Sequence, residues 1–330
     1  MPYCPVDWNR GGYSMRLFAA ERFVLGFITI LFVIDTVLIA VKGIGVDYAG
    51  YLLCGSMGAG VFILGQFYRK SGRDLRIAAA LIAGGLFILF TLVASVFNYM
   101  FLPVAFPAID HVLFRVDAAF GYSWMGIVTW AATHPWIGTI LFFVYATSLP
   151  QLLVIVITLG FTGKERMLHH FLVTGVLGAF ASIIFWIFFP SFGPSAYVQL
   201  PQWVSQTIPL AVDNAYGQEL NRLITEGVVH LSPKNVLGLI GFPSFHILMA
   251  AMSVWFVPRH WLVMAVILPI NILMLPAVLV QGGHHLSDIF GGLVAFAIVC
   301  AASAWLLKWL SVRERNGEKA RASTQVVAAE

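Results

Sequence analysis

Residues 261 to 288 read WLVMAVILPINILMLPAVLVQGGHHLSD, and this stretch contains the two features that recur along the chain. The part before Gly282 has no Asp, Glu, Lys or Arg, and about twenty such residues suffice to cross a bilayer as a helix. The stretch then ends in a polar island, Gly282 to Asp288. Because ionisable residues at the edge of a membrane are costly and usually functional, we expect an apolar helical scaffold that holds a polar site.

The composition indicates an integral membrane protein. Of the 330 residues, 60% are hydrophobic and 10% are charged, and the mean hydropathy is +0.88, whereas about 25% of an average soluble domain is charged. Judged by length and lack of charge, the predicted spans lie at about 23–41, 50–68, 77–103, 136–160, 170–189, 243–258, 261–281 and 286–310. The break between the sixth and seventh spans rests only on Pro258, Arg259 and His260. The predicted fold class is all-α, a polytopic transmembrane helical bundle of about eight spans.

Basic residues are distributed unevenly over the segments between these spans. If the N-terminus is cytoplasmic, 15 of the 19 Lys and Arg residues fall on the inside and 4 on the outside. The positive-inside rule therefore predicts that both termini are cytoplasmic. The same bias explains the net charge of +4, so this charge gives no support to a nucleic-acid partner.

Under this topology, the sixth and eighth spans both begin on the outer face. Ser244, His246, His284 and Asp288 are then expected to meet at one membrane depth. Two long loops, at about 104–135 and 190–242, lie on the same side. Loops of this length often serve as lids or binding segments.

The residues around Ser244 have types that suit anion binding. Pro243 favours the first position of a helix, so Ser244 and its neighbours would offer a hydroxyl and free backbone N–H groups. His246 would lie beside the bound anion, where an imidazole with a pKa near 6.5 can donate or accept a proton.

The second island adds a nucleophile and a residue that orients it. His284 and Asp288 are four residues apart, which would put them on one helix face. An aspartate bonded to one ring nitrogen fixes the tautomer and makes the other nitrogen more nucleophilic. Gly282 and Gly283 allow a sharp turn or the close approach of a ligand.

Together these residues suit phosphoryl transfer through a phosphohistidine. The predicted roles are phosphate binding for Ser244, attack for His284, orientation of His284 for Asp288, and protonation of the leaving oxygen for His246. We expect no cofactor and no metal. A zinc site remains an alternative, since His246, His284, His285 and Asp288 are suitable ligand types.

The two islands resemble the second and third signature motifs of the type-2 phosphatidic acid phosphatase superfamily of lipid phosphatases and phosphotransferases. Over roughly 100–300, the chain is similar to the branch that includes fungal inositol phosphorylceramide synthase and many bacterial membrane proteins. The matching residues are 117–121, Trp124, 145–151, 190–194, 241–246, 271–275, 282–285, Asp288, Gly291 and Gly292. The resemblance implies a six-helix catalytic core with phosphohistidine chemistry on the non-cytoplasmic side, and it favours the inner (plasma) membrane of a bacterium.

Two cationic motifs of the wider superfamily are missing. Ala277 and Val278 stand where its third motif has a Ser-Arg pair, and there is no Lys-x6-Arg-Pro motif. Another group must then neutralise the phosphate. The outer-face candidates are Arg115, Arg222, Lys234 and His285. We favour Arg222, which lies in a predicted amphipathic helix at 218–224 and has a counterpart in many members of the branch.

These observations divide the chain into an N-terminal region with about three transmembrane helices (1–103), a catalytic bundle (104–312) and a basic cytoplasmic tail (313–330). We expect a lipid phosphatase or phosphotransferase that acts on a lipid phosphate or phospholipid donor at the outer leaflet. The acceptor would be water or a lipid or sugar alcohol. Membrane lipids would surround the protein.

Two other functions stay open. One is a phospho-head-group transferase of the inositol phosphorylceramide or sphingolipid synthase type. The other is a non-catalytic transporter or scaffold, which would show scattered intramembrane charges and an internal repeat. Neither feature is found in the sequence. Asp35, inside the first span, is expected to be a structural partner of a neighbouring helix.

Overall fold

The computed structural model describes residues 17–257 and 261–327, and this part of the chain is almost entirely helical. Six of its helices are long and apolar enough to cross a membrane. They are α1 (Ala19–Lys42), α2 (Tyr48–Ser71), α3 (Leu75–Tyr99), α8 (Glu165–Phe188), α12 (Trp261–Gln281) and the first part of α13 (Leu286–Val327). The prediction of an all-α polytopic bundle is confirmed.

Shorter elements complete the bundle. Within predicted spans lie α6 (Pro135–Ala146), α7 (Ser148–Phe161) and α11 (Phe245–Phe256). The predicted loops contain α4 (Asp110–Ala119), α5 (Trp124–Thr133), α9 (Gln202–Thr207), α10 (Asn214–Glu226) and the single turns η1 (Pro194–Ala196) and η2 (Pro233–Asn235). A parallel pair of two-residue strands, β1 (Gly45–Val46) and β2 (His230–Leu231), joins the α1–α2 turn to the segment before α11.

Prolines explain two breaks in the helices. The span predicted at 136–160 is divided at Thr147, because the ring of Pro150 crowds the preceding turn and its nitrogen cannot donate a hydrogen bond there. His134, which precedes Pro135, has a non-helical backbone (φ −127°, ψ 71°), and a residue before a proline is disfavoured in the α region. As a result, α5 and α6 meet at a bend of 117°.

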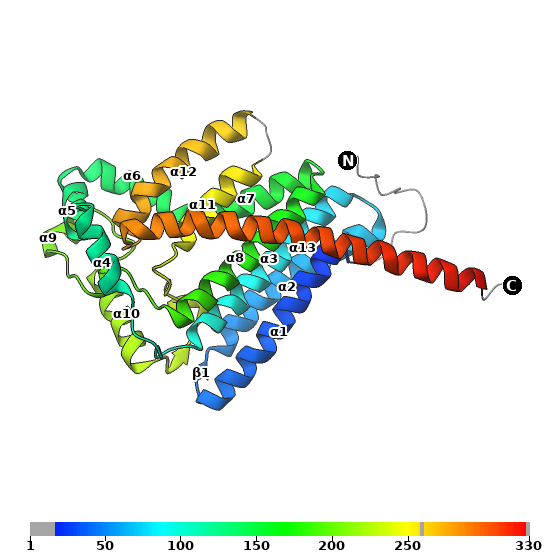
Figure 1. Ribbon diagram of the computed structural model, residues 1–330, viewed down its shortest axis with the longest axis horizontal. Helices are drawn as coiled ribbons and strands as arrows, with labels where there is room; N and C mark the ends of the chain where they lie inside the picture. Colours follow the sequence, from blue (N-terminus) through cyan, green and yellow to red (C-terminus); the bar gives the residue numbers. More distant parts are fainter. Residues whose placement is uncertain (1–16, 258–260, 328–330) are drawn as a thin grey trace.

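One further boundary differs from the sequence prediction, and another cannot be compared with it. Helix α13 continues to Val327, so most of the predicted tail at 313–330 belongs to a helix, which extends past the bundle in Figure 1. The predicted turn at 258–260 lies outside the described residues.

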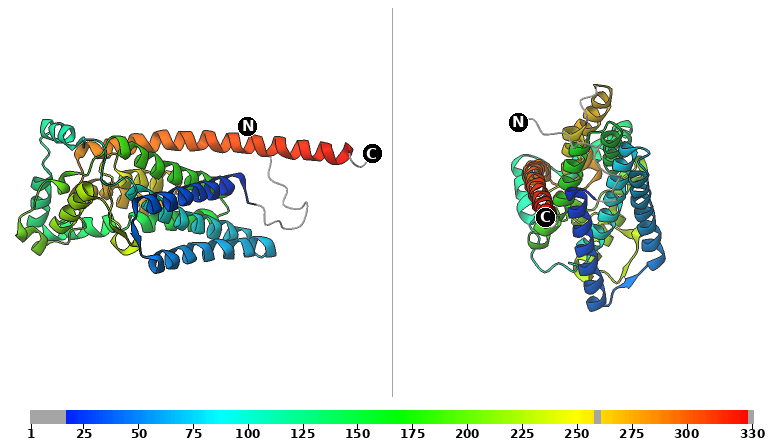
Figure 2. Two further views of the ribbon diagram at one scale, coloured as in Figure 1. Left: turned by 90° about the horizontal axis from the view of Figure 1, so that it is seen from below. Right: turned by 90° about the vertical axis from the view of Figure 1, so that its right-hand side faces the viewer.

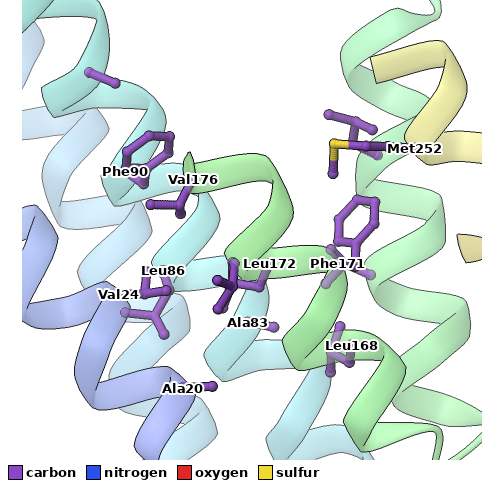
Figure 3. Close-up of a cluster of buried hydrophobic side chains, with 14 of the residues drawn as sticks. Ala20, Val24, Ala83, Leu86, Phe90, Leu168, Phe171, Leu172, Val176 and Met252 are labelled. Carbon is purple, nitrogen blue, oxygen red and sulfur yellow. The ribbon is translucent and has the colours of Figure 1, made fainter. Parts of the chain in front are cut away.

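Four helices, α1, α3, α8 and α11, meet in one hydrophobic core cluster, to which α7 also contributes buried residues. Figure 3 shows apolar side chains of these four helices near one another, among them Val24, Leu86, Phe171 and Met252, all of which are fully buried. In contrast, only 11% of the apolar window of α2 is buried. Most of α2 therefore faces away from the protein, as expected for a helix that borders lipid.

Glycines bring α2 and α3 into backbone contact. A Cβ atom at Gly85 would lie 2.6 Å from the backbone nitrogen of Phe62, and one at Gly65 would lie 2.8 Å from that of Ile82. Small residues at the interface are how transmembrane helices approach closely without a hydrophobic driving force.

The short helices gather at one end of the bundle. Figure 1 shows α4, α5, α6, α9 and α10 around the beginning of α13, at the end opposite to the C-terminus. Figure 2 shows α13 running along the other helices and past them. The two segments predicted as long loops are therefore on the same side of the bundle.

Two buried acidic residues of α1 have contrasting surroundings. Glu21 receives two hydrogen bonds of 2.7 Å from Arg69 of α2, and the ring of His169 of α8 lies 3.5 Å away. Asp35 is 3% exposed, but in the described part of the chain neither of its carboxylate oxygens has a hydrogen-bond partner. The partner expected for Asp35 on a neighbouring helix is thus not seen.

The α2–α3 contact gives a paired test. Gly85→Ala should destabilise the protein by about 1–3 kcal/mol, because the new methyl group overlaps the backbone of Phe62. Gly84→Ala meets nothing within 4 Å, so it should be neutral or stabilising by up to about 1 kcal/mol through helix propensity. Thermal unfolding of the purified protein in detergent measures both, and equal effects would contradict the packing.

Candidate active site

Ser244 begins α11. Its backbone is extended (φ −62°, ψ 113°) and its hydroxyl accepts a 3.5 Å hydrogen bond from the N–H of Ile247, as an N-cap serine does. The helix therefore starts at Phe245, and the prediction that Pro243 takes the first helical position is wrong. The first N–H groups of a helix have no partner inside it, so they point toward the space beside Ser244.

The turn that precedes α13 is tightly enclosed. Gly283 has a φ of +63°, which favours glycine, and a Cβ atom there would lie 2.7 Å from the hydroxyl of Ser195. Gly193, with a φ of +77°, packs directly against the carbonyl of Gly283. The hydroxyl of Tyr122 donates a 3.0 Å hydrogen bond to the carbonyl of His284. The predicted role of the glycines in a sharp turn agrees with this geometry.

His284 and Asp288 are in contact, although they do not share a helix face. Helix α13 begins at Leu286, so His284 lies before it and this detail of the prediction is wrong. Nδ1 of His284 is 2.8 Å from Oδ2 of Asp288, and the same oxygen accepts a 2.9 Å hydrogen bond from the N–H of His285. The non-helical turn allows one carboxylate to hold two consecutive residues.

The structure brings the two polar islands together. Nε2 of His284 lies 3.5 Å from the hydroxyl of Ser244, and the rings of His246 and His284 are 6.1 Å apart at 71°. A backbone hydrogen bond of 3.2 Å runs from Ser244 to the carbonyl of Asp288. Three of the four residues are buried and His246 is partly exposed. The open side of the cluster is therefore at His246.

Burial and charge keep His284 neutral. Removal from water and the neighbouring His285 lower the pKa of His284 to about 4, although the carbonyl of Gly241 acts in the opposite direction. We assign the single proton of the neutral ring to Nδ1, because the carboxylate of Asp288 accepts it there. Nε2 then carries a lone pair directed toward Ser244, which is the form that a nucleophile needs.

His285 has the opposite electrostatic surroundings. Its Nδ1 is 2.6 Å from Asp117 and its Nε2 is 3.3 Å from Asp110, and the ring is fully buried. Burial disfavours the imidazolium, but Asp110, Asp288 and Asp117 outweigh it and raise the pKa of His285. Because both ring nitrogens are engaged, His285 has none left for the phosphate that it was predicted to bind.

Asp110 is the residue that sequence reasoning missed. Besides His285, its carboxylate accepts hydrogen bonds from the hydroxyl of Ser191 and from the N–H groups of Phe192 and Gly193, at 2.9–3.2 Å. It therefore ties α4 to the segment after α8 and to the turn before α13. The available signal was an acidic residue directly after the apolar run 101–109.

The three predicted phosphate-binding cations lie elsewhere. Helix α10 includes the predicted helix at 218–224, but Arg222 is partly exposed and pairs with Glu219 at 2.6 and 2.8 Å. Arg115 of α4 and Lys234 of η2 are exposed. Within the described chain, none of the three forms a hydrogen bond or ion pair with Ser244, His246, His284 or Asp288.

The zinc alternative finds no geometric support. In residues 17–257 and 261–327, no group of three or more His, Cys, Asp or Glu side chains is arranged to hold a metal ion. His284 and His285 instead direct ring nitrogens at carboxylates, as described above.

The fold and the site define a polytopic membrane protein with a buried Ser-His-Asp cluster beside a second histidine. The family model of the PAP2 superfamily matches residues 111–303, more than half of the chain, and the chain belongs to this superfamily. Membership supports a membrane enzyme of the lipid phosphatase or phosphotransferase type. No curated protein and no solved structure matches the chain.

The two carboxylates around His285 lead to a pH-dependent prediction. Because the pKa of His285 is raised in the folded protein, its interaction with the two carboxylates stabilises the fold fully below about pH 6.5, the pKa of a free histidine. This stabilisation is lost as the pH rises through the pKa that His285 has in the folded protein. Asp117→Asn should therefore lower the free energy of unfolding by about 3 kcal/mol at pH 6 and by less at pH 9. Thermal unfolding at the two pH values measures this difference.

The control for this experiment is Asp213→Asn. Asp213 caps α10 by accepting a hydrogen bond from Tyr216, and asparagine caps helices equally well. Stability should change little at either pH. A loss for Asp117→Asn that did not depend on pH would contradict the assignment of a charged His285.

Proposed function

We propose that this chain is a lipid phosphatase or phosphotransferase that works through a covalent phosphohistidine on His284. The observation that carries the proposal is the environment of this ring. Its Nδ1 is held by Asp288, while its Nε2 faces Ser244 at the start of α11. A neutral imidazole with one fixed proton and one free lone pair is prepared for attack on phosphorus.

The reaction has two balanced steps. In the first, Nε2 of His284 forms a bond to phosphorus, the bond from phosphorus to the leaving oxygen breaks, and His246 gives that oxygen its proton. In the second, His246 removes a proton from water or an alcohol, whose oxygen bonds to phosphorus while the bond to His284 breaks. The Ser244 hydroxyl and the first N–H groups of α11 hold the phosphate oxygens.

The charge distribution supports a site on the outer side of the membrane. A cytoplasmic N-terminus puts 15 of 19 basic residues on the inside, and this bias favours an outward direction for the end of the bundle that carries the site. The donor is then a lipid phosphate or phospholipid of the outer leaflet. For a bacterial chain, as the sequence resemblance suggests, this is the periplasmic leaflet of the inner membrane.

One observation favours a phospho-head-group transferase of the inositol phosphorylceramide synthase type as a second candidate. Ala277 and Val278, which replace the superfamily's Ser-Arg pair, are fully buried in the apolar core. Without that arginine the site has less positive charge to offset a phosphate. A phosphomonoester carries close to two negative charges at pH 7, whereas a phosphodiester carries one, so diester donors suit this site better.

The covalent step predicts a labelled intermediate. Phosphatidic acid and phosphatidylinositol, each labelled in the phosphate, should leave alkali-stable label on the purified chain when the reaction is quenched. His284→Ala should abolish this label and reduce turnover by at least about a thousandfold. His230 is an exposed histidine of β2, so His230→Ala should behave as the wild-type protein does. Label that persists in His284→Ala would overturn the proposal.

The charge argument predicts donor preference. Among donors with identical acyl chains, phosphodiester lipids should be turned over with a kcat/KM at least about tenfold above that of phosphatidic acid, equivalent to about 1.4 kcal/mol. The rate with diesters should also rise when a lipid alcohol is added as acceptor. A preference for phosphatidic acid with release of free phosphate would instead identify a phosphatase.

A further inference from the structure

His246 differs from the other site residues in how it is held. Hydrogen bonds fix His284, Asp288 and Ser244, whereas no hydrogen bond or ion pair to the described part of the chain fixes either ring nitrogen of His246. A general acid works only when its proton is within hydrogen-bond reach of the oxygen that receives it. Something other than a hydrogen bond must therefore set the orientation of this ring.

The ring of Tyr145 supplies a contact of the required kind. Its centroid is 4.4 Å from that of His246 and the two planes differ by 26°, a stacked arrangement. Among the described residues, the only other ring contact of His246 is the edge contact with His284, at 6.1 Å and 71°. Stacking restrains the plane of the imidazole while both nitrogens stay free for substrate.

Tyr145 is itself firmly placed. A Cβ atom at Gly282 would lie 3.0 Å from Cε2 of Tyr145 and 2.7 Å from Cδ2 of His284, so the backbone of Gly282 fills the space between the two rings. The hydroxyl of Ser148 donates a 2.7 Å hydrogen bond to the carbonyl of Tyr145. The Tyr145 hydroxyl has no hydrogen-bond partner among the described residues. The contact between Tyr145 and His246 is therefore made by the aromatic ring and not by the hydroxyl.

We propose that Tyr145 is a positioning residue that holds the imidazole of His246 in the plane from which it protonates the leaving oxygen. The inference rests on the proposed function and adds a residue to it. Because α6 ends just after Tyr145, at Ala146, the break at Thr147 places this ring at the depth of the first turn of α11.

The chemistry supplies a specific readout. When the bond from phosphorus to the leaving oxygen breaks, an alkoxide needs the proton of His246, whereas nitrophenolate leaves without it. A misplaced His246 should therefore slow the release of a lipid alcohol much more than the release of nitrophenol. General damage to the fold would slow both reactions alike.

The test compares variants of the full-length chain in detergent, with phosphatidic acid and p-nitrophenyl phosphate as probes. Tyr145→Leu should lower kcat on phosphatidic acid by about tenfold to a hundredfold with little change in KM, and kcat on p-nitrophenyl phosphate by less than about threefold. Tyr145→Phe, which keeps the ring, should restore most of the rate. Phe143→Leu, an exposed position of the same helix, is the matched control.

Coupling to His246 completes the test. In a His246→Ala background, Tyr145→Leu should cause no further loss on phosphatidic acid, because the group that it positions is gone. An equal loss on both probes, an additive effect in the double variant, or a structure of Tyr145→Leu with an unchanged His246 rotamer would each overturn the inference.

Failure of the proposed function would have a different signature. His284→Ala and His246→Ala would then leave the rates on both probes unchanged, or the wild-type protein would turn over neither probe nor a phosphodiester lipid. If His246→Ala shows the leaving-group dependence and Tyr145→Leu does not, only the role of Tyr145 is wrong.

Discussion

The rest of the site depends on how the imidazole of His285 is held between Asp110 and Asp117. Both carboxylates belong to α4, and the histidine belongs to the turn before α13, so this contact fixes the position of His284 one residue earlier. Asp110 also receives the N–H groups of Phe192 and Gly193. Burying charges is costly unless each is paired and hydrogen-bonded, and here one imidazole and two carboxylates join three segments that are distant in sequence.

The helices end where the site needs polar backbone groups. Helix α6 ends at Ala146, α11 begins at Phe245, α12 ends at Gln281 and α13 begins at Leu286. Irregular backbone at membrane depth is tolerated only where protein surrounds it. Gln281 shows how this is achieved: its side chain accepts from the N–H of Ala211 and donates to the carbonyls of Gly138 and Pro209. The short helices at this end thus supply hydrogen bonds that a membrane cannot.

The sequence predicted features that depend on local pattern and missed those that depend on distant contacts. Apolar runs predicted the long helices, and the spacing of His284 and Asp288 predicted their contact. The same spacing suggested a shared helix face, which the turn at Gly283 replaces. Asp110 and Asp117 could not be paired with His285 from the sequence, because about 170 residues separate them. The ion pair between Arg222 and Glu219 is local, three residues apart, and it was not predicted from the sequence.

His284 and His285 show why residue type alone does not define a role. They are adjacent and both are buried, yet their pKa values shift in opposite directions. His285 faces Asp110 and Asp117, so its charged form is stabilised; His284 has the positive ring of His285 as its neighbour, so its neutral form is favoured. The proposed roles, His285 as a structural cation and His284 as the nucleophile, rest on this difference. Asp110 and Asp117 therefore favour the neutral form of His284 through His285, although their side chains do not bond to the ring of His284.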